Sequence, residues 1–159
     1  MAKSRPPAPP DLDAARAALF DAGLQHRRAA LGNAWVEKSL ARRNAFNADF
    51  QGLITRFAWG EIWSRPGLDH KTRRFLVLGM TMAQGRWEEF RLHTRAGLAE
   101  GGFTWQELRE VILQGAIYCG VPAANTAMNE AEAILNELGL MPEPAGTAAK
   151  VSKIQPGNI

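Results

Sequence analysis

Three polar side chains recur at helical spacing within QGRWEEFRLH, residues 84–93. Arg86, Glu89 and His93 are three and then four residues apart, so on one helix they would share a side, within an arc of roughly 60°. An arginine can hold an anion, and a histidine can transfer a proton near neutral pH. The same spacing is typical of surface ion pairs, which stabilise a helix only weakly. Spacing alone favours that second interpretation.

The apolar face of the same helix gives the stripe a context. Trp87, Phe90, Thr94 and Leu98 recur on one side, and the polar stripe borders that side instead of opposing it. The wall of a pocket would lie at such a border. Metal binding is not indicated, because one histidine and one carboxylate do not make a site and the other two histidines lie in unrelated segments.

Composition favours one helical domain without disulfides. The chain has 159 residues, of which 46% are hydrophobic and 22% charged, enough for a core of its own. A single cysteine, Cys119, excludes an internal disulfide and any CxxC redox or zinc motif within one chain. Cytoplasmic residence is the default expectation. We find no apolar run near the roughly 18 residues of a membrane span, and no signal peptide.

The basic charge lies outside the expected fold. Lys3 and Arg5 give residues 1–10 a charge of +2, and Lys150 and Lys153 against Glu143 give residues 141–159 a charge of +1. Subtracting both from the total of +3 leaves residues 11–140 neutral. Nucleic-acid binding is therefore not expected, because a basic stripe should lie on the folded part.

Periodicity and turn residues place the elements that carry the stripe. Apolar residues recur at spacings of three and four, and no segment alternates like a strand, so we expect an all-α domain. The expected helices cover residues 12–30, 35–41, 45–63, 69–85, 86–100, 104–118 and 123–138. A capping box at Thr104 and Glu107 should begin the sixth, and Gly139 should end the seventh. The expected division is a proline-rich arm (1–10), a helical domain (11–140) and a tail (141–159).

Residues 56–127 resemble the gamma-carboxymuconolactone decarboxylase family. The segments WGEIWSRPGLD, LHTRAGLAEGG and AIYCGVPAAN are each close to the family's wording. The resemblance implies an all-α fold of six to seven helices, shared with alkylhydroperoxidase-like proteins and assembled into homotrimers or homohexamers.

The superfamily comparison also bears on the stripe. Peroxidase-like members carry Cys-x-x-Cys-x-x-x-His on this helix, with a glutamate twelve residues before the first cysteine. Here Arg86 and Glu89 replace the cysteines, Arg74 replaces the glutamate, and His93 is kept. Peroxide reduction is excluded, since that chemistry needs an attacking thiolate and a resolving thiol.

The family's substrate implies what the chain must do. Gamma-carboxymuconolactone, an intermediate of protocatechuate degradation, carries a ring carboxylate and an acetate arm. Its decarboxylation sends electrons through the unsaturated lactone to the carbonyl oxygen, and protonation at carbon gives 3-oxoadipate enol-lactone. No cofactor or metal is obligatory, because the lactone accepts the electrons. The protein must hold the retained carboxylate, stabilise the enolate and supply a proton.

These tasks suggest roles for the stripe. Arg74 and Arg86 are predicted to bind the anion. His93 is predicted to donate the proton or to stabilise the enolate, and Glu89 to orient its ring or tune its pKa. The alternative for Arg74 is a surface residue at a helix start.

A second group of candidates lies upstream. Glu61 is a further acid or base candidate, and the alternative is a pair with Arg65 four residues on. Trp59 and Trp63 are predicted to supply apolar walls, with Trp59 in contact with substrate. The apolar run 75–82 and the segment AIYCGVP are further candidate walls. The alternative is that both simply belong to the helical core, where such segments are equally common.

Two other functions remain open. A helical regulatory or nucleic-acid-binding module fits the pI, near 9.4, but not the neutral body. A divergent superfamily member could act on another small carboxylic acid, or serve as a non-catalytic helical oligomer.

Overall fold

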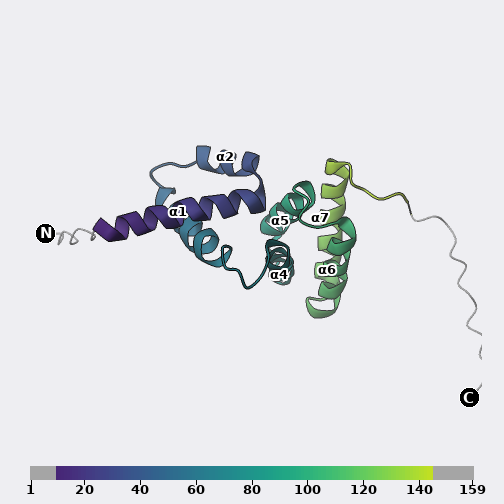
Figure 1. Ribbon diagram of the computed structural model, residues 1–159. Coiled ribbons are helices and arrows are strands. Elements are labelled where there is room, and N and C mark those ends of the chain that lie inside the picture. Colours follow the sequence, from purple (N-terminus) through teal and green to yellow (C-terminus); the bar gives the residue numbers. More distant parts are fainter. Residues whose placement is uncertain (1–9, 145–159) are drawn as a thin grey trace, which may run out of the picture.

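The computed structural model describes residues 10–144, and within that range the protein is helical without a strand (Figure 1). The predicted all-α fold is confirmed. The expected arm falls outside the described residues apart from residue 10, as does most of the expected tail. The elements are α1 (Pro10–Leu31), α2 (Asn33–Ala41), α3 (Ala48–Ile54), η1 (Thr55–Ile62), α4 (His70–Ala83), α5 (Trp87–Ala99), α6 (Trp105–Tyr118) and α7 (Val121–Leu138).

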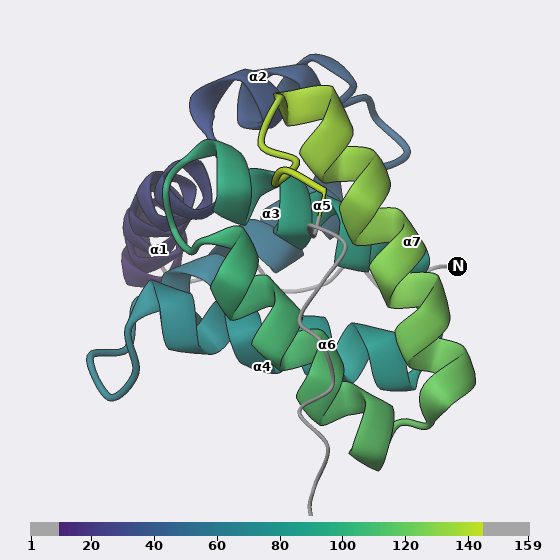
Figure 2. The same ribbon diagram turned by 90° about the vertical axis from the view of Figure 1, so that its right-hand side faces the viewer.

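The helices form two groups that meet at α5. In Figures 1 and 2, α6 and α7 lie side by side against α4 and α5, while α1 and α2 lie on the other side of α5. Each group has its own apolar core. The α4–α7 core includes Leu78, Met82, Phe90, Leu108, Ile112 and Ile134, and the second core includes Ala30, Leu31, Val36, Trp59, Trp63 and Ala96. Because α5 contributes to both cores, its residues lie at the junction.

The structure replaces the second half of the expected helix 45–63 by a π-helix. The helix starts at Ala48 and changes at Thr55 into η1, where hydrogen bonds span five residues, as from Trp63 N to Ala58 O at 2.9 Å. Periodicity did not indicate this change, because an apolar face repeats at similar spacings in both helix types. Such segments are frequent at functional sites.

Helix η1 packs backbone to backbone against α1. A Cβ atom on Gly23 would lie 2.0 Å from the carbonyl oxygen of Thr55, and one on Gly60 would lie 2.6 Å from that of Leu19. Only glycine fits at such an approach. These two residues therefore set the position of η1, and with it the position of its tryptophans.

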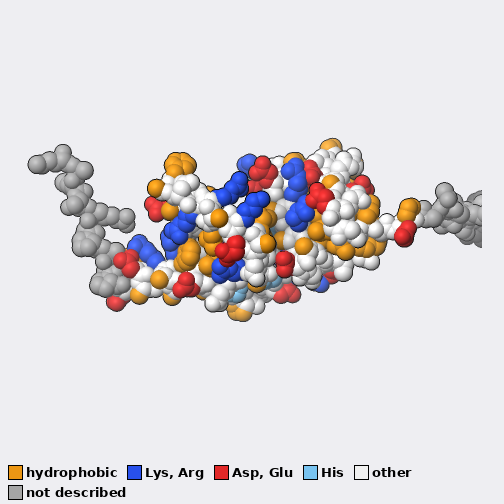
Figure 3. Space-filling view, turned by 90° about the horizontal axis from the view of Figure 1, so that it is seen from above, with side chains coloured by type: hydrophobic (Ala, Val, Ile, Leu, Met, Phe, Trp, Pro, Cys, Tyr) orange, Lys and Arg blue, Asp and Glu red, His pale blue; other side chains and the backbone are white. Residues whose placement is uncertain are grey.

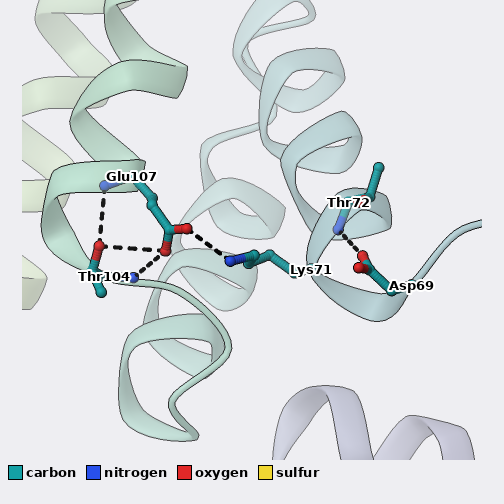
Figure 4. Close-up of polar contacts among 5 residues, drawn as sticks. All are labelled: Asp69, Lys71, Thr72, Thr104 and Glu107. Carbon is teal, nitrogen blue, oxygen red and sulfur yellow. Dashed lines mark hydrogen bonds and ion pairs between the residues drawn. The ribbon is translucent and has the colours of Figure 1, made fainter.

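Capping side chains fix where α4 and α6 begin (Figure 4). The Asp69 carboxylate accepts a hydrogen bond from Thr72 N at 2.7 Å, and Thr104 and Glu107 form the predicted capping box. Lys71 joins the two helix starts through an ion pair of 2.7 Å with Glu107. This contact holds α4 and α6 together at one end.

The surface carries mixed charge. On the face seen in Figure 3, basic side chains are interspersed with acidic and apolar ones. Over residues 10–144, no helix is long and apolar enough to cross a membrane.

Candidate functional site

A cavity of about 520 Å³ lies where α5 faces the helices α1, α2, α3 and η1. Its volume falls within the range of typical small-molecule sites. Its walls combine apolar, polar and charged side chains from α1, α2, α3, η1 and α5: Arg27, Leu31, Trp35, Ser39, Gln51, Ile54, Trp59, Glu88, Glu89, Leu92 and His93. Three of the predicted site residues, His93, Glu89 and Trp59, therefore lie around one cavity.

His93 lies in the wall of this cavity and is almost fully buried. Its side of α5 faces η1, where its ring stacks against Trp63 at 5.8 Å and Trp59 at 6.4 Å between centroids. Only 8% of the residue is exposed, and Nδ1 has no hydrogen-bond partner within residues 10–144. Burial, and secondarily the charge of Arg74, lower the pKa of His93 to about 4. The imidazole is therefore neutral at pH 7.

Arg74 lies next to His93, outside the cavity lining. It is 3% exposed, and it donates from Nη1 to the carbonyl oxygen of His93 at 3.3 Å and from Nη2 to that of Ala30 at 2.5 Å. The alternative of a surface residue is wrong, because the residue is buried and two backbone carbonyl oxygens bind its guanidinium. Its contacts are those of a residue that positions α1 and α5.

Two glutamates, Glu88 and Glu89, line the cavity, and both are exposed to solvent. Glu89 lies one turn before His93 and lines the cavity together with Glu88. No hydrogen bond joins Glu89 to His93 in the part of the chain that the structure describes. The His93 ring is oriented by the stacked tryptophans, and a role of Glu89 in tuning it stays a prediction.

Arg86 and Glu61 do not line the cavity. Arg86 directly precedes α5 and is exposed, so the predicted helical stripe begins one residue before the helix. Glu61 lies on η1 but is exposed, whereas Trp59 on the same element is only 6% exposed. Neither side chain is therefore in a position to contact a ligand in this cavity. The roles predicted for Arg86 and Glu61 stay predictions.

Arg27 is a cavity residue that the sequence analysis missed. It is 4% exposed and donates to three neutral oxygens: Thr55 Oγ1 at 3.3 Å, Ser39 Oγ at 2.9 Å and Gln51 Oε1 at 3.3 Å. A signal was present, because Arg27 is four residues from both Gly23 and Leu31 and so occupies a position on the buried face of α1.

The apolar candidate walls lie elsewhere. Residues from the run 75–82 and from AIYCGVP line a separate groove of about 540 Å³ between α4 and α6, which includes Phe75, Leu76, Gly79, Tyr118 and Cys119. Expecting them around the site was wrong, because the residues of these segments that line a pocket lie beside the α4–α7 core, and none of them lines the cavity at His93.

The donor groups of the cavity suit an organic acid better than a metal. Across residues 10–144, no three His, Cys, Asp or Glu side chains gather as a metal site would require. A buried arginine, a neutral imidazole and aromatic walls instead provide hydrogen-bond donors next to apolar surface. Fold and cavity together define an all-α protein with a small-molecule site at the junction of two helix groups.

Comparison with known proteins shows the family to which this all-α protein belongs. Residues 48–133 match the carboxymuconolactone decarboxylase family, and the chain belongs to it. The chain is 46% identical to the 4-carboxymuconolactone decarboxylase of Acinetobacter baylyi over 124 residues, which cover 78% of this chain and 92% of that protein. It is 42% identical to a nitrosuccinic acid decarboxylase of Metarhizium robertsii over 120 residues, covering 76% and 83%. The predicted family is confirmed.

Proposed function

We propose that this chain decarboxylates 4-carboxymuconolactone to 3-oxoadipate enol-lactone, without a cofactor, in the cavity around His93. The predicted class of enzyme, a carboxy-lyase, is confirmed by the family and by two relatives that are decarboxylases. The choice of substrate is supported by the identity of 46% over nearly the whole length of the bacterial relative. The proposal includes a place in protocatechuate degradation and a cytoplasmic location.

The observation that carries the proposal is a buried, neutral imidazole in the wall of a cavity that is open to solvent on one side. Decarboxylation breaks the bond between the ring carbon and the carboxylate, CO₂ leaves, and the electron pair moves through the lactone to its carbonyl oxygen. A neutral imidazole N–H can donate a hydrogen bond to that oxygen. Because the pKa of His93 is about 4, we favour enolate stabilisation over proton donation by an imidazolium.

The remaining task is protonation of the enolate at carbon. Glu89 lines the cavity on the His93 side of α5 and is exposed to water, from which a proton can be replenished. We therefore assign proton delivery to Glu89, acting directly or through a water molecule. Trp59 supplies a low-polarity wall beside the reacting carboxylate, where loss of neutral CO₂ is favoured, and Trp63 stacks behind it on the His93 ring.

The candidate arginines take different roles in this proposal. Arg74 is a positioning residue, because both Nη atoms donate to carbonyl oxygens. Arg86 is exposed and outside the lining, so it is not needed for the step at His93.

A second candidate function is decarboxylation of another small dicarboxylic acid. The relative named for nitrosuccinic acid is almost as similar as the one named for carboxymuconolactone, so this fold accommodates more than one acid. Both reactions need a group beside the leaving carboxylate that accepts electrons. A non-catalytic helical oligomer is disfavoured by the same relatives.

Turnover by the purified protein separates these possibilities. Freshly prepared 4-carboxymuconolactone and nitrosuccinate are supplied in turn, with and without a chelator, and CO₂ release and ultraviolet absorbance are followed. We expect turnover of the lactone, unaffected by the chelator, and a fall in kcat of at least about 100-fold in His93→Ala. Turnover of nitrosuccinate alone would favour the second function, and near-wild-type turnover by His93→Ala would remove His93 from the mechanism.

We also propose that the protein forms a homo-oligomer, trimeric or hexameric. The support is a group of exposed apolar side chains before and along α3 and η1: Phe46 (97% exposed) in the turn before α3, Phe50 (60%) and Leu53 (54%) on α3, and Phe57 (59%) on η1. A group of exposed apolar side chains of this kind is unusual on a monomer and typical of a subunit interface. The partners in the proposal are a small acid and further copies of this chain, not nucleic acid or a membrane.

A further inference from the structure

We infer that Arg27 is the receptor for the carboxylate that the substrate keeps after CO₂ has left. This inference rests on the proposed function, because it presumes that the cavity binds an acid with two carboxylates. The guanidinium comes from α1, opposite the helix that carries His93, and both residues line the same cavity.

The first argument is that the charge of Arg27 is not neutralised. Its three hydrogen-bond partners are two hydroxyl groups and an amide oxygen, none of which carries a charge. No ion pair in the described residues includes it. Burial lowers the pKa of Arg27, as expected for a cation that lacks a counter-charge. A buried charge without a partner is unfavourable, and an anionic ligand would relieve this.

The second argument is that donors remain available. An arginine has five N–H donors, and three hydrogen bonds are formed, which leaves two. The Nε–H is one of them, buried and without a partner within residues 10–144. Carboxylates are the anions whose planar pair of oxygens suits a guanidinium.

The third argument is that the guanidinium is held in place before a ligand arrives. Its Cζ lies 5.2 Å from the centroid of the Trp35 ring, and Ser39 and Gln51 fix Nη2. Trp35, Ser39 and Gln51 also form walls of an adjoining cavity of about 410 Å³, which is lined by Lys38 and Arg42. The positive charges of Lys38 and Arg42 therefore lie next to the Arg27 site, where they favour an anionic ligand.

The chemistry decides which carboxylate Arg27 holds. A cation on the leaving carboxylate would stabilise the ground state more than the transition state, since that charge is lost as CO₂ forms. Holding the retained carboxylate avoids this penalty, because its charge does not change. The leaving group then lies against the apolar part of the lining, which Leu31, Ile54, Trp59 and Leu92 provide.

The test pairs a change in the protein with a change in the ligand. The substrates are 4-carboxymuconolactone and its methyl ester on the acetate arm, and the variants are Arg27→Gln, Arg27→Lys and Arg28→Gln. Arg28 is the matched control, because it neighbours Arg27 on α1 but forms an exposed ion pair with Glu37. We expect the wild type and Arg28→Gln to prefer the diacid in kcat/KM by at least about 30-fold. Arg27→Gln should lose this preference, and Arg27→Lys should keep part of it. An equal loss on both substrates, or an unchanged preference, would overturn the inference.

A binding measurement keeps the inference separate from the proposed reaction. Succinate and monomethyl succinate serve as probes in calorimetric titrations, which need no turnover. We expect the wild type and Arg28→Gln to bind succinate more tightly than the monoester, and Arg27→Gln to bind it at least about 30-fold more weakly. With this result the inference stands even if the lactone is not a substrate. Equal binding of succinate by wild type and Arg27→Gln, or none by the wild type, would refute it. Circular dichroism melting verifies that each variant is folded.

Discussion

The guanidinium of Arg74 donates a hydrogen bond to the carbonyl oxygen of His93, 3.3 Å away, and its charge lowers the pKa of the same residue's ring. One buried cation thus holds the α5 backbone and adds to the effect of burial on the imidazole. Its second hydrogen bond, to the carbonyl oxygen of Ala30, attaches the end of α1 to the same point. Arg74 therefore contributes both to the position of His93 and to the lowering of its pKa.

Arg74→Gln should raise the pKa of His93 above about 4, because the positive charge beside the ring is lost. The pKa should stay below its ordinary value of 6.5, since burial is the larger cause of the shift. Histidine ring NMR signals followed over pH measure this directly. Arg73→Gln is the control and should leave the His93 titration unchanged. An unaltered His93 pKa in Arg74→Gln would contradict the electrostatic argument.

Stability should fall as the pH drops from about 6.5 to about 4. In that interval the unfolded chain binds a proton at His93 and the folded protein does not, so protonation favours unfolding. The shift of about 2.5 pKa units corresponds to at most about 3 kcal/mol. Urea unfolding of wild type and His93→Gln between pH 4.5 and 7.5 measures it. The variant should lose less stability than the wild type on acidification, and parallel curves would exclude His93 as the cause.

Glu89→Gln should lower kcat by at least about 10-fold if Glu89 delivers the proton, and Glu88→Gln should lower it less. Both side chains are exposed and line the cavity, but only Glu89 is four residues from His93 and on its side of α5. Steady-state kinetics, with product formed in deuterium oxide as a second readout, measure the difference. Equal effects of the two substitutions would mean that Glu89 contributes only negative charge at the mouth.

Phe50→Glu combined with Phe57→Glu should dissociate the oligomer. The two substitutions would introduce negative charge into the exposed apolar group at residues 46–57. Multi-angle light scattering after size-exclusion chromatography reports the mass. Leu140→Glu is the control: Leu140 is also exposed, at 43%, but follows α7 and is not part of the group at residues 46–57. A wild type that is monomeric, or a double variant of unchanged mass, would refute this interface.

The helices could be predicted from the sequence because their signals are local. The capping box at Thr104 and Glu107 and the left-handed Gly139, with φ of 67°, end or begin helices within one or two residues of the expected positions. The π-helix could not be predicted in this way, since its start at Thr55 depends on the approach of η1 to Gly23 on another helix.

The site was predictable only in part, for a related reason. His93, Glu89 and Trp59 were identified and lie around one cavity. Arg27 was missed because a charged residue interrupts the apolar periodicity by which the buried face of a helix is recognised in a sequence. The contacts that reveal its role come from residues 12 to 28 positions away in the chain. Arg74 was identified, but its carbonyl partners depend on how α1 ends against α5.

The direction in which Trp63 points depends on the number of residues that precede it in α3 and η1. A segment bonded at i→i+5 accommodates an additional residue per turn, so deletion of one residue in η1 would allow residues 48–62 to continue as a regular α-helix. The α-helix would restore the phase that the additional residue had taken up, so each side chain beyond the deletion would keep about the same direction. Insertion of one residue into the α-helical part, Ala48–Ile54, without a further π turn would instead rotate each later side chain by about 100° around the axis. Trp63 would then leave the face of His93 without any change in its own identity. Insertions in this segment should therefore reshape the cavity more than most substitutions within it.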